Sequence, residues 1–283
     1  RVYEQQRQLA LTYYIDCRNR ASKRGYDHLR RKLSGIAKDL QKMLMLGVSL
    51  FVPTDRQESY RDLQIGRTLK CGYFQDDGEN FIDQGKPEDP NQTQFWLDLT
   101  EFKTAATYGA FWYPLPNVTF VDGTTFYEQI GSWLWGFEDI AGNWPVCYPD
   151  DPLWQGYIDE QGNRHGWRVA LPPDNHGYFF SQPNNKQPYE SSNFRSVIRQ
   201  IFVRFTQETG KPIPVTPHSM RHMLSSYLDK LDLSREERES FAYVMHHSLE
   251  THEKDYVYRD RLRRITPAAE RMRSILQDMT FDC

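Results

Sequence analysis

The types and spacing of a few residues in segment 216–258 suit chemistry on a phosphodiester. His218 and Arg221 follow Thr216 and Pro217, residue types that favour the cap and the first position of a helix. The pair is therefore predicted on the first turn of a helix, where free backbone N–H groups and the helix dipole attract a phosphate. We expect a scissile phosphate to be held at this helix start. The same helix has an expected apolar face at helical spacing, made by Met220, Leu224, Tyr227, Leu228 and Leu231.

The His-x-x-Arg spacing has little weight by itself, because chance alone predicts roughly 0.7 occurrences in a chain of this composition. It occurs three times, at His28 and Arg31, at His165 and Arg168, and at His218 and Arg221. The first pair lies in a basic helical run and the second in a turn-rich segment flanked by glycine. Only the third pair is followed by further residues that suit the same chemistry.

Those further residues lie beyond a second predicted helix. Ser234 and Glu237 have the spacing of a capping box, which predicts that a helix starts there and continues through Met245. A His-His-Ser sequence follows, and Tyr256 stands nine positions after His247. A histidine and a phenol are thereby added to the pair on the preceding helix.

The motifs PHSMRH and MHHS, followed by a tyrosine, resemble the C-terminal half of the catalytic domain of the tyrosine recombinases, the phage-integrase family. In that family the corresponding motifs carry the His-x-x-Arg pair, a second histidine and the nucleophilic tyrosine. The resemblance assigns these roles to His218, Arg221, His247 and Tyr256.

Two neighbouring residues are alternatives within these motifs. His246 precedes His247 and could be the functional histidine, although counting back from Tyr256 favours His247. Tyr258 could replace Tyr256 as the nucleophile. His246 also stands where the family usually has a glycine.

The resemblance requires an arginine and a lysine further upstream. The family places its first catalytic arginine after an apolar helix and close to a threonine, and Met43–Phe51 followed by Pro53–Arg56 fits this description. Arg56 is therefore the first choice. Arg61 is the alternative, but its place within a short predicted helix favours a structural role or a contact with the DNA backbone.

The lysine of the family lies in a hairpin between two strands. Residues 95–99 and 111–115 are rich in aromatic and aliphatic side chains and are predicted strands. Lys103 lies between them and is the only Lys or Arg between Lys86 and Arg164, so it has no local competitor.

The resemblance also implies a mechanism without metal or cofactor. A tyrosine has a pKa near 10, so its attack on phosphorus needs proton removal and neutralisation of the phosphoryl oxygens. Arg56 and Arg221 would neutralise these oxygens through paired hydrogen bonds. His218 would assist proton transfer, His247 would bond a non-bridging oxygen, and Lys103 would protonate the departing 5′ oxygen.

Charge is distributed unevenly over the 283 residues, although the net charge is only −3. Residues 1–70 hold 15 basic and 7 acidic side chains, residues 71–194 hold 5 and 18, and residues 195–283 hold 15 and 13. Phosphate contact is therefore expected at the two ends of the chain, with the acidic middle facing away from DNA.

Candidate DNA contacts lie on a predicted helix whose apolar face runs from Phe194 to Phe205, with Ser192 as its expected cap. Arg195, Arg199 and Arg204 occupy its remaining surface. The family commonly uses the corresponding helix near the major groove, so these arginines are candidate backbone or base contacts; a solvated face is the equal alternative.

The predicted organisation is a basic helix or linker at 1–34 followed by a catalytic domain at 35–283, with an acidic, aromatic-rich insertion at about 138–176. Residues 35–51 are expected to form an apolar core helix, and residues 177–181 a short strand. Within the insertion we expect a hairpin at Tyr157–Val169 and aromatic side chains that pack as local core, with stacking on unpaired bases as the alternative. The fold class is α+β and mainly helical, with a small antiparallel sheet.

No apolar run reaches membrane-spanning length. With no such run and no signal-like start, we expect a soluble intracellular protein, cytoplasmic and nucleoid-associated in a prokaryote or nuclear in a eukaryote. The cysteines, at positions 17, 71, 147 and 283, match no metal-ligand spacing, so we expect reduced thiols.

We therefore expect a site-specific DNA recombinase or integrase that binds double-stranded DNA and assembles on it as a dimer or tetramer. Type IB topoisomerases and telomere resolvases share much of this chemistry and are the enzymatic alternatives. The alternative of another class is a catalytically silent DNA-binding protein of a mobile element.

Overall fold

The computed structural model describes the chain at residues 1–24, 32–52, 57–76, 78–100, 112–136, 156–159, 161, 163–171, 177–182, 187–207, 210–231, 233–246, 248–253 and 271–272. The chain divides into two compact units, Arg1–Met220 and Arg221–Cys283. The border falls inside one helix, and every described strand belongs to the first unit.

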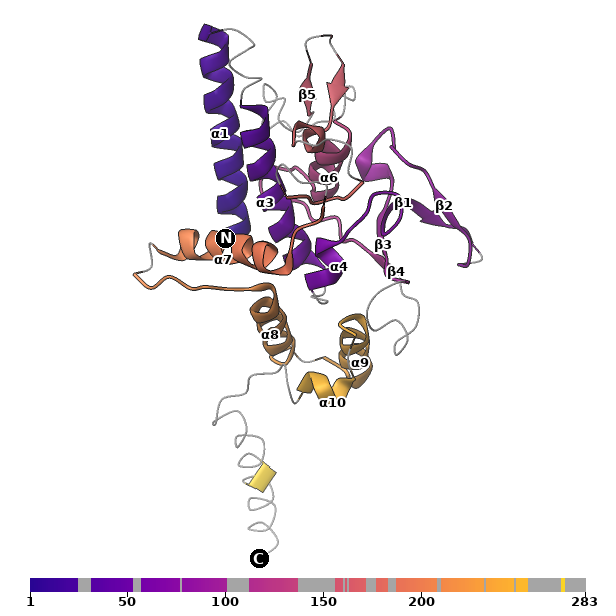
Figure 1. The fold of residues 1–283 in the computed structure, drawn as a ribbon. Helices are drawn as coiled ribbons and strands as arrows, with labels where there is room; N and C mark the ends of the chain where they lie inside the picture. The colour runs from indigo at the N-terminus through magenta and orange to yellow at the C-terminus, as the bar shows by residue number, and fades with distance from the viewer. Residues whose placement is uncertain are drawn as a thin grey trace, which may run out of the picture. The chain divides into compact units, whose positions relative to one another are not determined.

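Two long helices lie side by side in the first unit (Figure 1). α1 spans Val2–Arg24 and α3 spans Leu33–Phe51. α3 is the more apolar of the two, and its buried side chains recur at helical spacing, as at Ile36, Leu40 and Met43. The predicted apolar core helix at 35–51 is confirmed.

α1 is fixed to this unit by apolar and ionic contacts. Leu11 and Tyr14 are buried, and so is Arg7, whose side chain is 1% exposed. The Arg7 guanidinium pairs with Asp122 and, at 2.9 Å, with Glu4. A buried guanidinium is tolerated when carboxylates meet its charge. The first helix is thus part of the core, while the predicted domain boundary after residue 34 stays a prediction.

The sheet is antiparallel and four-stranded, in the order β2-β1-β3-β4. Its strands are β1 Leu69–Phe74, β2 Phe81–Asp83, β3 Phe95–Asp98 and β4 Trp112–Pro114. β3 and β4 form the predicted hairpin, with Leu97 opposite Tyr113. Alternate side chains face the core; those buried include Leu69, Cys71, Phe95 and Leu97.

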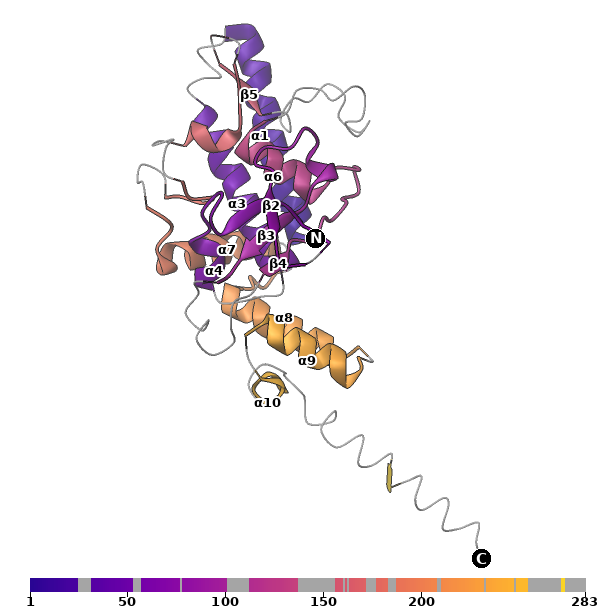
Figure 2. The same cartoon turned by 90° about the vertical axis from the view of Figure 1, so that its right-hand side faces the viewer.

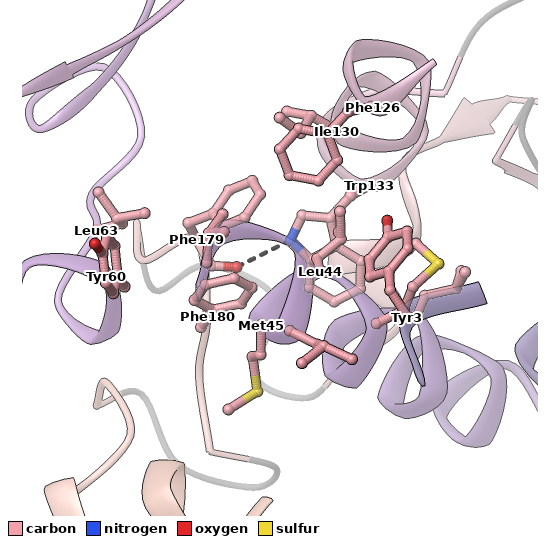
Figure 3. Close-up of a cluster of buried hydrophobic side chains, with 14 of the residues drawn as sticks. Tyr3, Leu44, Met45, Tyr60, Leu63, Phe126, Ile130, Trp133, Phe179 and Phe180 are labelled. Atoms are coloured by element: carbon pink, nitrogen blue, oxygen red, sulfur yellow. Dashed lines mark hydrogen bonds between the residues drawn. The ribbon is translucent and has the colours of Figure 1, made fainter. Parts of the chain in front are cut away.

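α6, Phe126–Leu134, covers the inner face of the sheet (Figure 2). It starts with a capping box made by Thr125 and Glu128, which satisfies free N–H groups of the first turn. Trp133 on this helix is 1% exposed and donates from Nε1 to the carbonyl of Phe179 at 2.9 Å (Figure 3). Rings from three distant segments of the first unit meet around this bond, which therefore ties segments far apart in sequence.

Shorter elements complete the first unit. They are α4 Gln57–Arg61, η1 Pro90–Gln92, β5 Tyr157–Ile158, β6 Arg164–His165, η3 Trp167–Ala170 and α7 Ser191–Thr206. β5 and β6 pair as the hairpin expected within the proposed insertion. Trp167 is fully buried, which confirms local core packing there. Residues 138–155, 160, 162 and 172–176 of that region lie outside the described residues.

The second unit contains most of α8, Pro217–Leu228, together with α9, Arg235–Val244, and α10, Leu249–Thr251. The predicted capping box of α9 is confirmed: Ser234 Oγ accepts from the backbone of Glu237, and the Glu237 carboxylate accepts from the backbone of Ser234.

Three local predictions differ from the structure. α7 starts at Ser191 with Glu190 as its cap residue, so Ser192 lies inside the helix. The strand expected at 177–181 is a single bridge between Tyr178 and Gln64. The expected apolar face of α8 is partly exposed, since Tyr227 is 59% exposed.

The fold class is α+β and mainly helical, with a four-stranded antiparallel sheet, as predicted. Its finer assignment to a recombinase domain is a proposal.

Candidate active site

The start of α8 has the predicted cap. Thr216 Oγ1 accepts a hydrogen bond from the backbone N–H of Ser219 at 3.2 Å, and Pro217 is the first helical residue. His218 follows on the first turn with an exposed side chain. Proline lacks the N–H group that would be unsatisfied there, so the sequence TPHS specifies the helix start locally.

Arg221 points into the interior of the second unit. It is 4% exposed, and its Nη2 donates to the main-chain carbonyl of Met245. Ser225, one turn later, is fully buried and donates from Oγ to Met245 Sδ at 3.7 Å. Leu228 follows on the same face of α8 and is also buried. The inward face of α8 is thus defined by an arginine and a serine as well as by leucine.

The turn after α9 presents the Met245 carbonyl. α9 ends at Val244, and His246 has φ 54°, the only positive φ at a non-glycine position among the residues that the structure describes. This left-handed conformation commonly terminates a helix and favours glycine, since it crowds Cβ. It is the position at which the resembling family usually has glycine, and His246 is 3% exposed here.

A buried histidine that the sequence analysis missed also lies in this unit. His252 is 4% exposed. Burial lowers its pKa and the charge of Arg221 acts in the same direction, whereas Glu253 and Asp229 act in the opposite direction. Its backbone N–H bonds the carbonyl of Ser248 at 2.9 Å. No motif signalled it, because a histidine five positions after His247 matches no expected pattern.

Four of the six predicted catalytic residues lie outside the described residues: Arg56, Lys103, His247 and Tyr256. The alternative nucleophile Tyr258 also lies outside them. The flanking elements are described, however. Arg56 follows α3 and immediately precedes α4, and Lys103 belongs to the connection of the β3–β4 hairpin. The structure therefore describes His218 and Arg221 directly and the elements on either side of Arg56 and Lys103.

The alternative first arginine, Arg61, is engaged within its own segment. Its Nε and Nη2 donate to the two carboxylate oxygens of Asp62, each at 2.7 Å, and this pair raises the pKa of Arg61. Arg61 borders an open hollow of ≈ 470 Å³ that Tyr189 and Ser191 also line. Because Asp62 already accepts from Nε and Nη2 of Arg61, these contacts favour a structural role for Arg61.

The second His-x-x-Arg pair has its own partners in the first unit. His165 Nε2 lies 2.8 Å from an Asp159 carboxylate oxygen, and Arg168 Nη1 donates to the carbonyl of Tyr178 at 3.4 Å. Asp159 also accepts from the backbone of Gln161 and Asn163, and these bonds, the His165 bond first, lower the pKa of Asp159 to about 2. The contacts fix the β5–β6 hairpin. The pair at His28 and Arg31 lies outside the described residues.

The candidate DNA-contacting arginines on α7 are all exposed, while Phe194 and Ile198 on the same helix are buried. Arg195 and Arg199 are one turn apart and lie on the same side of the helix. Arg204 falls half a turn out of phase with Arg195, beside the Phe205 ring at 5.6 Å. Arg195 and Arg199 can thus follow one line of phosphates, and Arg204 lies on the other flank of the buried face.

Within the described ranges, no group of three His, Cys, Asp or Glu side chains is arranged to hold a metal ion. In the same ranges, no helix combines the length and the apolar character needed to cross a bilayer. Cys17 and Cys71 are free thiols, both buried. Cys147 and Cys283 lie outside the described residues.

No protein-family model, no curated protein and no solved structure matches this chain. Its functional assignment therefore rests on its own residues and their arrangement.

Proposed function

We propose that the chain is a site-specific DNA recombinase of the tyrosine-recombinase type, which cleaves and rejoins DNA through a 3′-phosphotyrosyl intermediate. The observation that carries the proposal is the order of six residues of the required types along the sequence: Arg56, Lys103, His218, Arg221, His247 and Tyr256. A set of six in the right order is far more specific than any one of its motifs.

Local structure around these positions supports the proposal. A helix-to-helix connection contains Arg56, an antiparallel hairpin contains Lys103, and a capped helix start carries His218. Arg221 is held by a main-chain carbonyl rather than extended into solvent. Such support restricts the guanidinium to few orientations, and a preorganised charge stabilises a transition state more effectively than a mobile one.

In the proposed reaction, the Tyr256 phenolate oxygen attacks phosphorus and forms a 3′-phosphotyrosyl bond. The bond from phosphorus to the 5′ oxygen breaks, and Lys103 gives that oxygen a proton. His218 assists removal of the phenol proton, because the unperturbed phenol is almost entirely protonated at neutral pH. Arg56, Arg221 and His247 bond the non-bridging oxygens.

Rejoining reverses these steps with a 5′ hydroxyl as the nucleophile. One phosphodiester is exchanged for another, so the bond energy is conserved and the reaction needs no ATP. The charge at phosphorus that a metal neutralises in other phosphoryl transfers is here assigned to the arginines.

Double-stranded DNA is the proposed substrate, and a dimer or tetramer on paired sites is the proposed assembly. The exposed Arg195 and Arg199 are the first candidates for backbone contacts, with Arg204 as a separate contact. Such an enzyme acts where DNA is, which is the nucleoid in a prokaryote and the nucleus in a eukaryote.

Covalent trapping tests the proposal. The chain is incubated with a library of nicked duplexes of random sequence, in which cleavage beside the nick releases a short fragment and prevents rejoining. We expect a protein–DNA adduct that survives denaturing electrophoresis, is sensitive to protease, and is absent for Tyr256→Phe. Tyr258→Phe is the matched control and should retain the adduct.

Other outcomes have definite meanings. An adduct that persists in Tyr256→Phe and disappears in Tyr258→Phe would move the nucleophile to Tyr258. DNA binding with no adduct in any variant would favour a catalytically silent DNA-binding protein. Relaxation of a supercoiled plasmid without exchange between two selected sites would favour a type IB topoisomerase, and formation of hairpin ends would favour a telomere resolvase.

A further inference from the structure

Four aromatic side chains form a cluster on the outer face of the sheet: Phe74, Phe81, Trp96 and Trp112. We call this cluster the aromatic sheet face. The ring centroid of Phe74 lies 5.0 Å from that of Trp96 and 5.2 Å from that of Trp112. The ring centroid of Phe81 lies 4.9 Å from that of Trp112. Each ring thus packs on at least one other ring of the cluster.

The aromatic sheet face is separate from the main core of the first unit. All four of its side chains are half-buried, and none of them belongs to the main hydrophobic cluster or packs against it in the described part of the chain. The strand pattern explains this, because Phe95 and Leu97 face the core while Trp96 between them faces the other way. Aromatic side chains that gather outside the core and keep part of their surface exposed are typical of contact surfaces.

This surface already holds one cation. Lys70 Nζ lies 4.6 Å from the centre of the Trp112 ring and 6.0 Å from that of Phe81. The same ammonium pairs with Asp98 at 3.0 Å. Faces of aromatic rings attract cations through their quadrupole, and a nearby carboxylate adds charge attraction. The chemistry of this face therefore suits ammonium and guanidinium groups.

The surrounding segment is strongly acidic. Residues 71–100 contain seven Asp or Glu and one basic residue, Lys86. Of these acids, Asp76, Glu79 and Asp83 lie exposed on or beside the β1–β2 hairpin. This charge repels nucleic-acid phosphates and attracts a basic partner.

We propose that the aromatic sheet face is a docking site for a basic peptide segment of a partner protein. Lys or Arg side chains of the partner lie against Phe74, Phe81 and Trp96, as Lys70 lies against Trp112, and their charge is met by the acidic β1–β2 hairpin. The occupant is chosen by charge complementarity and by the cation–aromatic contact already present. This proposal does not rest on the proposed DNA chemistry.

Fluorescence anisotropy of the full chain with a labelled twelve-residue Lys/Arg-rich peptide tests this site, with an acidic peptide of equal length and oligo-dT as comparison ligands. We expect the basic peptide to bind and the acidic peptide not to bind, with an affinity for the basic peptide that falls as salt is raised. Any binding of oligo-dT at the proposed DNA contacts should be unaffected by changes in the aromatic sheet face. Phe81→Leu keeps an apolar side chain on the edge strand and removes the ring, so it should weaken binding about two- to fivefold. Circular dichroism would verify that this variant is folded.

Removing charge at two different places distinguishes docking on the aromatic sheet face from general electrostatic attraction between the peptide and the chain. Glu79→Gln with Asp83→Asn should weaken peptide binding and reduce its salt dependence. Glu236→Gln with Glu239→Gln removes the same charge from exposed positions of α9 and should leave binding unchanged. Equal effects of the two double variants, or no effect of Phe81→Leu, would overturn the proposal.

Two further outcomes would assign a different ligand to the aromatic sheet face. Oligo-dT binding that is lost in Phe81→Leu would make the face a stacking platform for single-stranded DNA. Concentration-dependent self-association in sedimentation, abolished by Glu79→Gln with Asp83→Asn, would make the occupant a basic segment of a second copy of the chain. Either result contradicts docking of a separate partner protein.

Discussion

The two units bury different kinds of side chain. The first unit has an extensive aromatic and aliphatic core, and its buried Arg7 is paired with carboxylates. In the described part of the second unit, three buried side chains are apolar and four are polar: Leu228, Ala242 and Met245 against Arg221, Ser225, His246 and His252.

The difference indicates that the interiors of the two units contribute differently to stability and to the positioning of polar groups. Burial of polar groups contributes less stability than burial of apolar groups and demands hydrogen-bond partners. An interior that includes an arginine and two histidines is therefore poorly suited to stabilise a small unit, and it is well suited to hold the Arg221 guanidinium in a fixed position. The comparison predicts that substitutions of buried side chains in the first unit affect stability most and that those of buried side chains in the second unit affect activity.

The largest effect on stability is expected at Arg7. Arg7→Ala leaves the buried Asp122 carboxylate without its guanidinium, and breaking such a pair costs about 3–5 kcal/mol. Urea unfolding followed by circular dichroism would measure the loss. Arg20→Ala is the control, since the Arg20 pair with Asp16 is exposed on the same helix and should contribute less than about 1 kcal/mol. Similar losses in both variants would contradict a buried ionic anchor.

The largest effect on activity is expected at Arg221. Arg221→Lys keeps a positive charge but loses the planar set of donors, so covalent trapping should slow by about 100- to 1000-fold. Arg238→Lys is the matched control, because Arg238 also donates to a carbonyl in the second unit, that of Leu233 at 2.9 Å. A comparable loss of trapping in the control would assign the Arg221 effect to general disturbance of the unit.

A smaller effect on stability is expected at Trp133. Trp133→Phe removes the Nε1–H donor and leaves the buried Phe179 carbonyl unsatisfied, at a cost of about 1–3 kcal/mol in the free energy of unfolding. The same unfolding measurement applies. Trapping activity at a temperature where the variant is folded should be unchanged, and a selective loss of activity would contradict the division between the units.

Two substitutions of His246 distinguish the contribution of backbone strain to stability from that of side-chain packing. Both His246→Gly and His246→Ala lose the buried ring, but only glycine relieves the strain of φ 54°. The glycine variant should therefore be more stable than the alanine variant by about 1 kcal/mol. Equal stability of the two in thermal melts would contradict the left-handed turn.

The smallest effect is a dependence on pH. The pKa of His252 is lower in the folded chain than its unfolded value near 6.5, so the neutral form favours folding. Its contribution is complete above the unfolded pKa and is lost as pH falls below it. Melting temperature should thus fall more steeply for the wild type than for His252→Gln between pH 7.5 and 5. Parallel curves would indicate that burial of His252 does not disfavour its charged form.

Local signals predicted several elements correctly. The capping boxes and turn residues act over three or four positions, so Ser234 with Glu237 specified the start of α9 and Thr216 with Pro217 that of α8. The β3–β4 hairpin followed from two runs of aromatic and aliphatic residues. These features depend on neighbours in sequence and need no knowledge of the tertiary fold.

Non-local packing was not predictable in the same way. Helical periodicity placed Tyr227 and Leu231 in an apolar face, but α8 is oriented so that Arg221 and Ser225 face inward and both apolar residues are exposed. His252 was missed because burial depends on tertiary packing; two of the charges that act on its pKa, those of Arg221 and Asp229, precede it by more than twenty positions. Polar residues that serve a site escape rules based on hydrophobic pattern.

The close approach of the strands at Gly72 limits where the β1–β2 hairpin can vary. A methyl group at position 72 would overlap the carbonyl oxygen of Ile82, so any larger residue there would push the two strands apart. Gly78, at the tip of the hairpin, has φ 69° and open space around it, so a replacement there meets backbone strain but no neighbouring atom. Position 72 is therefore closed to substitution by steric overlap, whereas a side chain at position 78 would leave the strand pairing of the hairpin intact.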